Sequence, residues 1–250
     1  MPDPLQLILH AAAAVAAFFQ SVTGIGFGMI AGPVVLVILE DPAAVVISTL
    51  MSWLIGLVLF PFLRHGTDWR LALRLLGGAV LGLPFGLFIL GLASVAGLKL
   101  LCGVVIASLT AMMLLGAPGM RTKGLTGDLI FGALAGFFGG CLAMPGPTAV
   151  LRAGGIGLDK ATVRATMVSF FALVWPMIFL GQWATLDLKT ETFLNAAMLV
   201  PATLAGLALG NYAATRVSER FFRALVIFFL IATATSLLFD AARSGLGDMI

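Results

Sequence analysis

Charged side chains are scarce in this sequence. Only 10% of its 250 residues are Asp, Glu, Lys or Arg, whereas soluble domains carry about 25%. The sequence is also 61% hydrophobic, and its mean hydropathy is +1.13. Because so few charges cannot cover a water-facing surface, lipid must be the solvent for much of the chain. The net charge of +3 is too small and too dispersed for a nucleic-acid partner, so we expect none.

The sequence also lacks the arrangements of side chains that carry catalysis or bind metals. The 11 acidic residues all fall in expected loops or near helix ends, and the two histidines, His10 and His65, are unrelated in position. No spacing of His, Cys and acids matches a metal site, so we expect no metal and no cofactor. No serine has an evident base and orienting acid. We therefore expect a protein that is not an enzyme, and a membrane-embedded enzyme is the last of the alternatives.

Apolar segments of spanning length recur along the chain, and each half begins with a shorter, interrupted pair. We expect an all-α polytopic membrane protein. The expected helical segments are 5–19, 25–39, 43–63, 71–92 and 98–115 in the first half, then 125–138, a short piece from Thr148, 161–180, 192–214 and 221–239 in the second.

The two halves resemble each other. Gly82 and Gly86 match Gly206 and Gly210 at an offset of 124 residues, and spacing of this kind favours close helix packing. Chance similarity between apolar, glycine-rich helices is the alternative. Because transporters are often built from repeats, we expect one transmembrane domain over 1–250. Its repeats are expected at 5–116 and 124–240, joined by a linker at 117–123.

Basic residues alternate between loops in opposite senses in the two halves. In the first half they concentrate in the second loop, with Arg64, Arg70 and Arg74. In the second half they concentrate in the first and third loops, which carry Arg152, Lys160, Arg164, Arg216, Arg220 and Arg223. Because cytoplasmic loops accumulate Lys and Arg, two inverted-topology repeats are predicted, each a broken-helix hairpin plus three transmembrane helices. Both termini then face outward from a cell membrane, for which we expect the bacterial inner membrane.

Glycine and proline cluster at the turn of each hairpin. The first tip covers residues 20–28 and the second covers 139–148. Such runs break helices, and broken helices at membrane depth occur where protein or a watery cavity satisfies the backbone. A helix that begins after the break presents free N–H groups and a positive dipole end. Two such ends facing each other would bind an anion without a charged side chain.

The tips therefore supply the candidate site for a small anionic substrate. The expected binding residues are Gln20, Ser21, Thr23, Gly24, Gly26, Gly28, Gly139, Gly140, Cys141, Met144, Gly146 and Thr148. Ser52, Trp53 and Trp175 could line the same cavity, with helix packing as the alternative. Arg152 and Arg164 could attract an anion at the cytoplasmic mouth, with a purely topological role as the alternative.

The first tip also carries a family resemblance. Gly-Ile-Gly-Phe-Gly at 24–28, the following Gly32 and Pro33, Asp-Trp-Arg at 68–70 and the repeated halves resemble the sulfite exporter TauE/SafE family, also called the 4-toluene sulfonate uptake permeases. The resemblance covers nearly the whole chain. The second tip departs from it, because Cys-Leu-Ala-Met-Pro at 141–145 stands where members often have another glycine cluster.

The resemblance implies a secondary transporter of small sulfur-containing anions, such as sulfite, sulfoacetate or taurine-like sulfonates. An anion channel, or a uniporter for other small organic anions, is the alternative. Proton coupling would need the substrate's own titration, His10 or a loop carboxylate, because no acid is expected inside a span. Besides the substrate and the lipid bilayer, a homo-oligomeric partner stays open.

Overall fold

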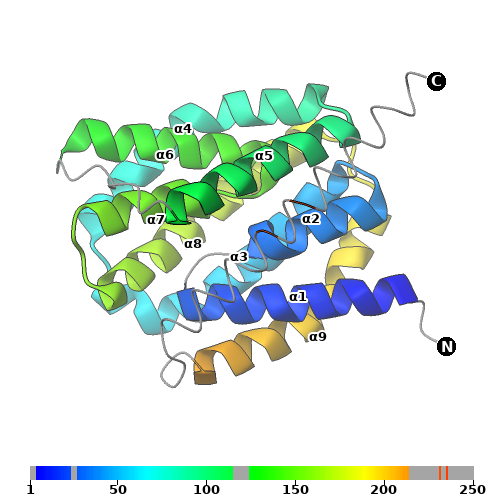
Figure 1. Ribbon diagram of the computed structural model, residues 1–250, viewed down its shortest axis with the longest axis horizontal. Helices are drawn as coiled ribbons and strands as arrows, with labels where there is room; N and C mark the ends of the chain where they lie inside the picture. Colours follow the sequence, from blue (N-terminus) through cyan, green and yellow to red (C-terminus); the bar gives the residue numbers. More distant parts are fainter. Residues whose placement is uncertain (1–3, 24–26, 115–123, 214–230, 232–234, 236–250) are drawn as a thin grey trace.

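The computed structural model describes residues 4–23, 27–114, 124–213, 231 and 235, and these form helices joined by short loops (Figure 1). Their order is α1 (Pro4–Thr23), α2 (Phe27–Leu39), α3 (Ala43–Leu63), the 3-10 turn η1 (Arg64–Gly66), α4 (Trp69–Leu92), α5 (Val95–Leu114), α6 (Leu125–Leu142), α7 (Gly146–Gly155), α8 (Lys160–Thr185) and α9 (Thr190–Ala213). The helix expected at 221–239 and most of the linker lie outside the described residues.

Six of these helices, α1, α3, α4, α6, α8 and α9, are long and apolar enough to cross a membrane. The all-α polytopic membrane class is therefore confirmed.

Aspartates cap the N-termini of two of the six helices. Asp68 accepts a hydrogen bond from the backbone N–H of Leu71 at 3.0 Å, and Asp159 accepts from Ala161 and Thr162 at 3.0 and 3.1 Å. The Thr162 hydroxyl and backbone N–H hold the pKa of Asp159 below its ordinary value, so this cap is charged at neutral pH.

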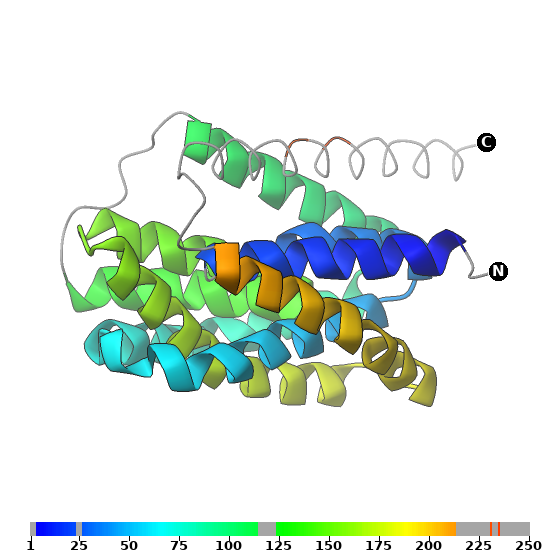
Figure 2. The same cartoon turned by 90° about the horizontal axis from the view of Figure 1, so that it is seen from below.

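Two helix pairs flank a central pair. α4 packs along α6, and α1 packs along α9. α3 and α8 pack on each other between these pairs, with α4 also touching α8 and α9 also touching α3. Figure 1 shows α4 and α6 on one side and α1 and α9 on the other, and Figure 2 shows the same bundle turned by 90°.

Glycine lets the α4–α6 pair approach to backbone contact. A Cβ added at Gly82 would overlap the carbonyl of Ala133, and one added at Gly86 would overlap the carbonyl of Phe137. From the other side, a Cβ at Gly136 would overlap the backbone of α4. The expectation that these glycines pack helices is therefore met in α4.

The α1–α9 pair is built in the same way. Gly206 and Gly210 of α9 lie against the carbonyls of Ala14 and Phe18, so the contacted residues are again an alanine and a phenylalanine four positions later. Each of the two pairs, which we call the α4–α6 seam and the α1–α9 seam, joins a helix from the first half of the sequence to a helix from the second half. The opposite orientation of the halves in the membrane stays a prediction.

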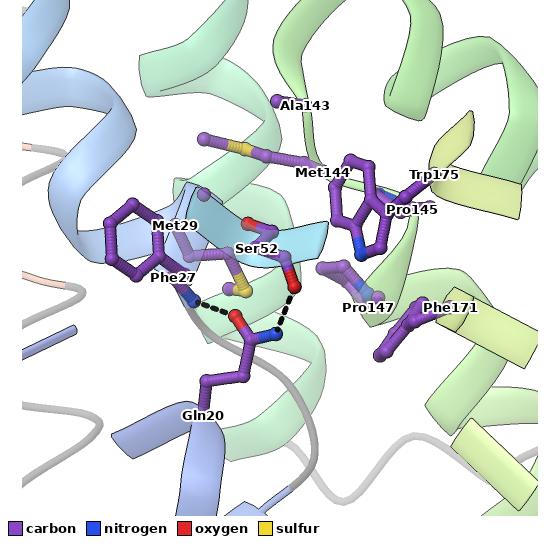
Figure 3. Close-up of a pocket in the computed structure, with 12 residues that line it drawn as sticks. Gln20, Phe27, Met29, Ser52, Ala143, Met144, Pro145, Pro147, Phe171 and Trp175 are labelled. Atoms are coloured by element: carbon purple, nitrogen blue, oxygen red, sulfur yellow. Dashed lines mark hydrogen bonds between the residues drawn. The ribbon is translucent and has the colours of Figure 1, made fainter. Parts of the chain in front are cut away.

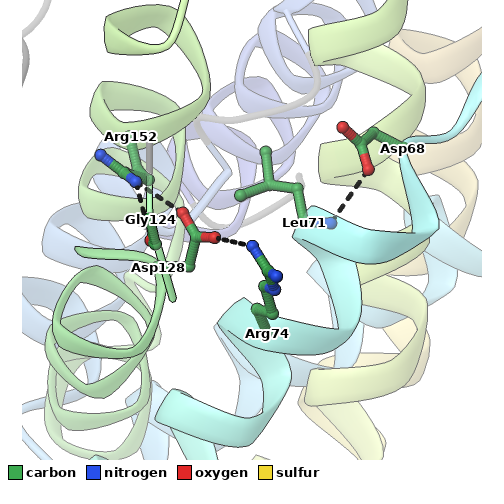
Figure 4. A network of polar contacts seen from close by, with 6 residues as sticks. All are labelled: Asp68, Leu71, Arg74, Gly124, Asp128 and Arg152. Carbon is green, nitrogen blue, oxygen red and sulfur yellow. Dashed lines mark hydrogen bonds and ion pairs between the residues drawn. The ribbon is translucent and has the colours of Figure 1, made fainter. Parts of the chain in front are cut away.

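One basic residue lies elsewhere than the sequence suggested. Arg152 was expected in a basic loop, but it lies within α7 and its side chain is fully buried. Its Nε donates to Asp128 Oδ1 at 2.7 Å and its Nη2 donates to the Gly124 carbonyl at 3.1 Å. Arg74 of α4 donates to Asp128 Oδ2 at 3.1 Å (Figure 4). Because a carboxylate compensates its charge, Arg152 can be buried, and it does not present a free charge to a cytoplasmic anion.

Candidate functional site

The two hairpin tips touch each other. α6 ends at Leu142, the next residue Ala143 has a left-handed φ of 55°, and α7 begins at Gly146. α2 begins at Phe27, and a Cβ added to the next residue, Gly28, would overlap the Ala143 carbonyl oxygen. Only glycine at position 28 allows this approach, so the N-terminus of α2 and the break between α6 and α7 meet.

A small cavity lies at this meeting point. Its volume is about 20 Å³, roughly the space of one water molecule. Both tips line it, together with side chains of α3 and α8 (Figure 3). The lining residues are Gln20, Phe27, Gly28, Met29, Ser52, Ala143, Met144, Pro145, Gly146, Pro147, Phe171 and Trp175.

Gln20 holds the first tip together. Its side chain is buried at the end of α1, where Oε1 accepts the backbone N–H of Phe27 at 3.1 Å. Nε2 donates to the Ser52 carbonyl at 3.3 Å (Figure 3). The side chain therefore caps the start of α2 and ties it to α3 across the break.

Two buried donors at the cavity have no partner among the described residues, the Ser52 hydroxyl and the Trp175 indole N–H. An unsatisfied buried donor costs about 1–3 kcal/mol. The N-termini of α2 and α7 also meet the cavity, and they present further N–H groups and positive dipole ends. The cavity therefore offers hydrogen-bond donors and helix N-termini, and none of its lining residues is charged. This arrangement suits a ligand that is rich in hydrogen-bond acceptors.

The structure brings six of the residues singled out from the sequence to this cavity: Gln20, Gly28, Ser52, Met144, Gly146 and Trp175. Gly24, Gly26 and the side chain of Thr23 lie outside the described part of the chain.

The other candidate residues have neighbours elsewhere. Ser21 donates to the Leu207 carbonyl at 3.1 Å, and Thr148 donates to the Pro145 carbonyl at 3.4 Å. Trp53 stacks on Phe179 with ring centroids 6.2 Å apart. The remaining three are packed in the interior: Gly139 against Ile178, Gly140 against Leu83, and the buried Cys141.

Some lining residues were not found from the sequence. Phe171 precedes Trp175 by one helical turn and therefore shares its face of α8, a spacing that could have identified it. Phe27, Met29, Ala143, Pro145 and Pro147 belong to the two tips, but they carry no polar side chain that would have singled them out.

Side chains of α8 also donate hydrogen bonds to backbone carbonyls near the ends of α1 and α6. Arg164 donates from Nε and Nη2 to the Ser21 carbonyl at 3.1 and 2.6 Å, near the end of α1. Gln182, about five turns further along α8, donates to the Gly140 carbonyl at 3.2 Å, near the end of α6. Phe171 and Trp175 lie between them on α8. One helix thus holds both tips around the cavity.

Comparison with known proteins gives one match. The family described as sulfite exporter TauE/SafE matches residues 9–237. No curated protein and no solved structure matches the chain.

Proposed function

Because this chain belongs to the sulfite exporter TauE/SafE family, and is therefore a multi-pass membrane transport protein, we propose that its anion site is the cavity between the two tips. The proposed activity is secondary transport of a small sulfur-containing anion, such as sulfite or an organosulfonate. The proposed location is the bacterial inner membrane, with both termini outside.

The observation that carries this proposal is the pair of unpartnered donors at the cavity. Ser52 Oγ and Trp175 Nε1 come from different helices and line the same space. Sulfite and sulfonate present three oxygen acceptors each, so one anion could satisfy both donors and still accept from the N-termini of α2 and α7. The lining carries no positive side chain, so the anion would be held by hydrogen bonds and helix dipoles.

The apolar part of the lining supports an anion with little hydration. Phe27, Met29, Met144 and Phe171 surround the donors. A small dianion would lose strong hydration here without a cation to compensate it, whereas a monoanion loses less. Among sulfur anions without a second charged group, bisulfite and simple alkyl or aryl sulfonates are monoanions. This favours them over sulfate.

The cavity must enlarge before it accepts such an anion. Its volume of about 20 Å³ matches roughly one water, and sulfite is larger than water. We propose that the two tips separate when α1–α2 or α6–α7 moves relative to α3 and α8. Rocking of one repeat against the other, with the repeats inverted in the membrane, would then expose the site alternately to each side.

Thermal stabilisation of the purified chain tests the site. The anions are sulfite, sulfate, thiosulfate, taurine, sulfoacetate and an aryl sulfonate, each compared with a carboxylate analogue where one exists. A ligand at about 100 times its Kd stabilises the folded state by about 2.7 kcal/mol. We expect a concentration-dependent rise in Tm for at least one sulfur monoanion and a smaller rise for its carboxylate analogue.

Variants locate the binding. Trp175→Phe and Ser52→Ala each remove one donor, and each should weaken binding about tenfold or more, since a hydrogen bond to a charged group contributes about 1.5–3 kcal/mol. Trp53→Phe is the matched control, because Trp53 also has an unpartnered indole N–H but does not line the cavity. Equal Kd values for all three variants and the parent chain would place the anion elsewhere.

A further inference from the structure

A polar contact lies at one end of the α1–α9 seam. His10 is on α1, one turn before Ala14, and its ring lies beside the backbone of α9. In the α4–α6 seam the corresponding end is held by the ion pair of Arg74 and Asp128 at 3.1 Å. Each seam thus has a polar side-chain contact at one end, followed by glycines that pack against the backbone of the other helix. The two contacts differ in chemistry, because the α4–α6 seam has an ion pair and the α1–α9 seam has a histidine beside backbone carbonyls.

Both ring nitrogens of His10 face carbonyl oxygens. Nδ1 lies 2.6 Å from the carbonyl oxygen of Gln6, and Nε2 lies 3.1 Å from the carbonyl oxygen of Met198. A carbonyl oxygen only accepts hydrogen bonds, and a neutral imidazole has a proton on one nitrogen alone. The neutral ring would therefore turn a lone pair toward one of the two oxygens. The imidazolium ring donates to both.

A second cavity lies beside this ring. His10 lines this cavity of about 30 Å³, with room for a water molecule, and Gln6 and Asn195 line it as well. The side chains of α2, α3 and α9 that face the cavity are Val35, Leu39, Ile47, Met198 and Leu199. The cavity therefore leaves space for a water molecule beside the ring.

No charged group lines this second cavity among the described residues. The acids nearest along the packed helices are Glu191, one turn before Asn195 on α9, and Glu40, which follows Leu39. Glu40 is paired with Lys99 at 3.4 Å. Asp41 accepts from the Ala43 backbone at 2.7 Å and caps α3. The groups that the two ring nitrogens of His10 face are therefore the carbonyls of Gln6 and Met198.

We propose that His10 is a proton-binding site that fastens α1 to α9. In its protonated form the ring bridges the two helices. When the ring loses the proton, one of its two contacts changes from a hydrogen bond to a repulsion between a lone pair and a carbonyl oxygen.

Ring nitrogen-15 NMR of the full-length chain, labelled at histidine and purified in detergent, tests this site directly. The sequence has two histidines, so His65→Gln leaves His10 as the single signal and His10→Gln leaves His65, which is exposed in η1. Ring N–H protons are seen only when hydrogen bonds protect them from exchange. At pH 6 we expect two protected ring N–H signals in His65→Gln and none in His10→Gln. A single protected N–H at pH 6 that stays single at pH 5.5, or none at either pH, would overturn the proposal.

The pH dependence of Tm provides a second readout. Histidine is the side chain whose charge changes between pH 5 and 8. Loss of one hydrogen bond in a chain of this length corresponds to a fall of about 2–4 °C. Between pH 6 and 8 the parent chain and His65→Gln should lose about this much more than His10→Gln loses, and identical pH profiles for all three would contradict the proton site. Neither measurement uses an anion, so their failure is distinguishable from failure of the proposed anion site.

Discussion

At the scale of single residues, Asp128 compensates the positive charges of two arginines inside the bundle. It accepts from Arg152 of α7 and from Arg74 of α4, and it lies in the first turn of α6 (Figure 4). A buried guanidinium is tolerated only when a carboxylate and further acceptors compensate it. Arg152 obtains the carboxylate from Asp128 and a further acceptor from Gly124. The cluster therefore joins three helices at one end of the α4–α6 seam.

Replacing Asp128 with asparagine should be strongly destabilising. Asp128→Asn removes the carboxylate that pairs with the fully buried Arg152 and with Arg74, and breaking a buried ion pair costs about 3–5 kcal/mol. Thermal or denaturant unfolding of the purified protein measures the change in the free energy of unfolding. Asp187→Asn, at an exposed loop acid between α8 and α9, is the matched control and should stay within about 0.5 kcal/mol of the parent chain. Similar losses for both substitutions would show that the cluster is not the cause.

The sequence predicted the composition of the candidate site better than the orientation of its side chains. Glycine and proline runs identified both tips, because such runs break helices wherever they occur. Ser52 lines the cavity and Trp53 does not, although they are neighbours in sequence, because successive helical residues point in different directions. The burial of Arg152 could not be predicted, since its partner lies 24 residues away on another helix.

At the scale of helices, the α4–α6 seam depends on glycines whose missing side chains face backbone. A Cβ at Gly82 would overlap the carbonyl of Ala133. A Cβ at Gly77, on the same helix, would lie 3.6 Å from Leu129 Cδ2, which is ordinary van der Waals contact. The two positions therefore separate the effect of close packing from the general effect of alanine in a helix.

The corresponding substitutions should act in different directions. Gly82→Ala forces α4 and α6 apart and should lower the free energy of unfolding by about 1–3 kcal/mol. Gly77→Ala should be neutral or slightly stabilising, because alanine favours helix more than glycine does. Comparing Tm in the same detergent checks both expectations. A destabilisation by Gly77→Ala as large as that by Gly82→Ala would argue against backbone contact in this seam.

The helix boundaries differ from those expected from the sequence by up to five residues, the largest difference being at the end of α8, and two differences are informative. α1 continues to Thr23, four residues beyond the expected end at 19, because no helix breaker precedes Gly24. α7 begins at Gly146, two residues before the expected start, because Pro147 is tolerated in the first turn of a helix. Polar residues and prolines thus mark helix ends only when their position within the turn is considered.

At the scale of the whole molecule, the inverted topology predicts the side on which each loop lies. The η1 turn after α3 is basic and should be cytoplasmic, whereas the loop between α8 and α9 has Lys189 alone and should be external. We expect a cysteine at His65 to react only from the cytoplasm and one at Thr185 only from outside. Both positions are exposed.

Labelling with a membrane-impermeant thiol reagent in intact cells and in inside-out vesicles measures this. Both native cysteines, Cys102 and Cys141, are buried, and they are replaced by alanine in the background. His65→Cys and Thr185→Cys serve as controls for each other. Reaction of both from the same side would refute the inverted arrangement without affecting the helical fold.

The contact between Gly28 and Ala143 bears on the affinity of the proposed site for its anion. The cavity beside it has room for about one water, so at the proposed site an anion would bind only to those molecules in which the two tips have moved apart. The measured Kd is then the intrinsic Kd divided by the fraction of molecules in that form. A rare open form makes the measured binding weaker than the intrinsic binding. A change that loosens this contact should therefore strengthen measured affinity while it lowers stability.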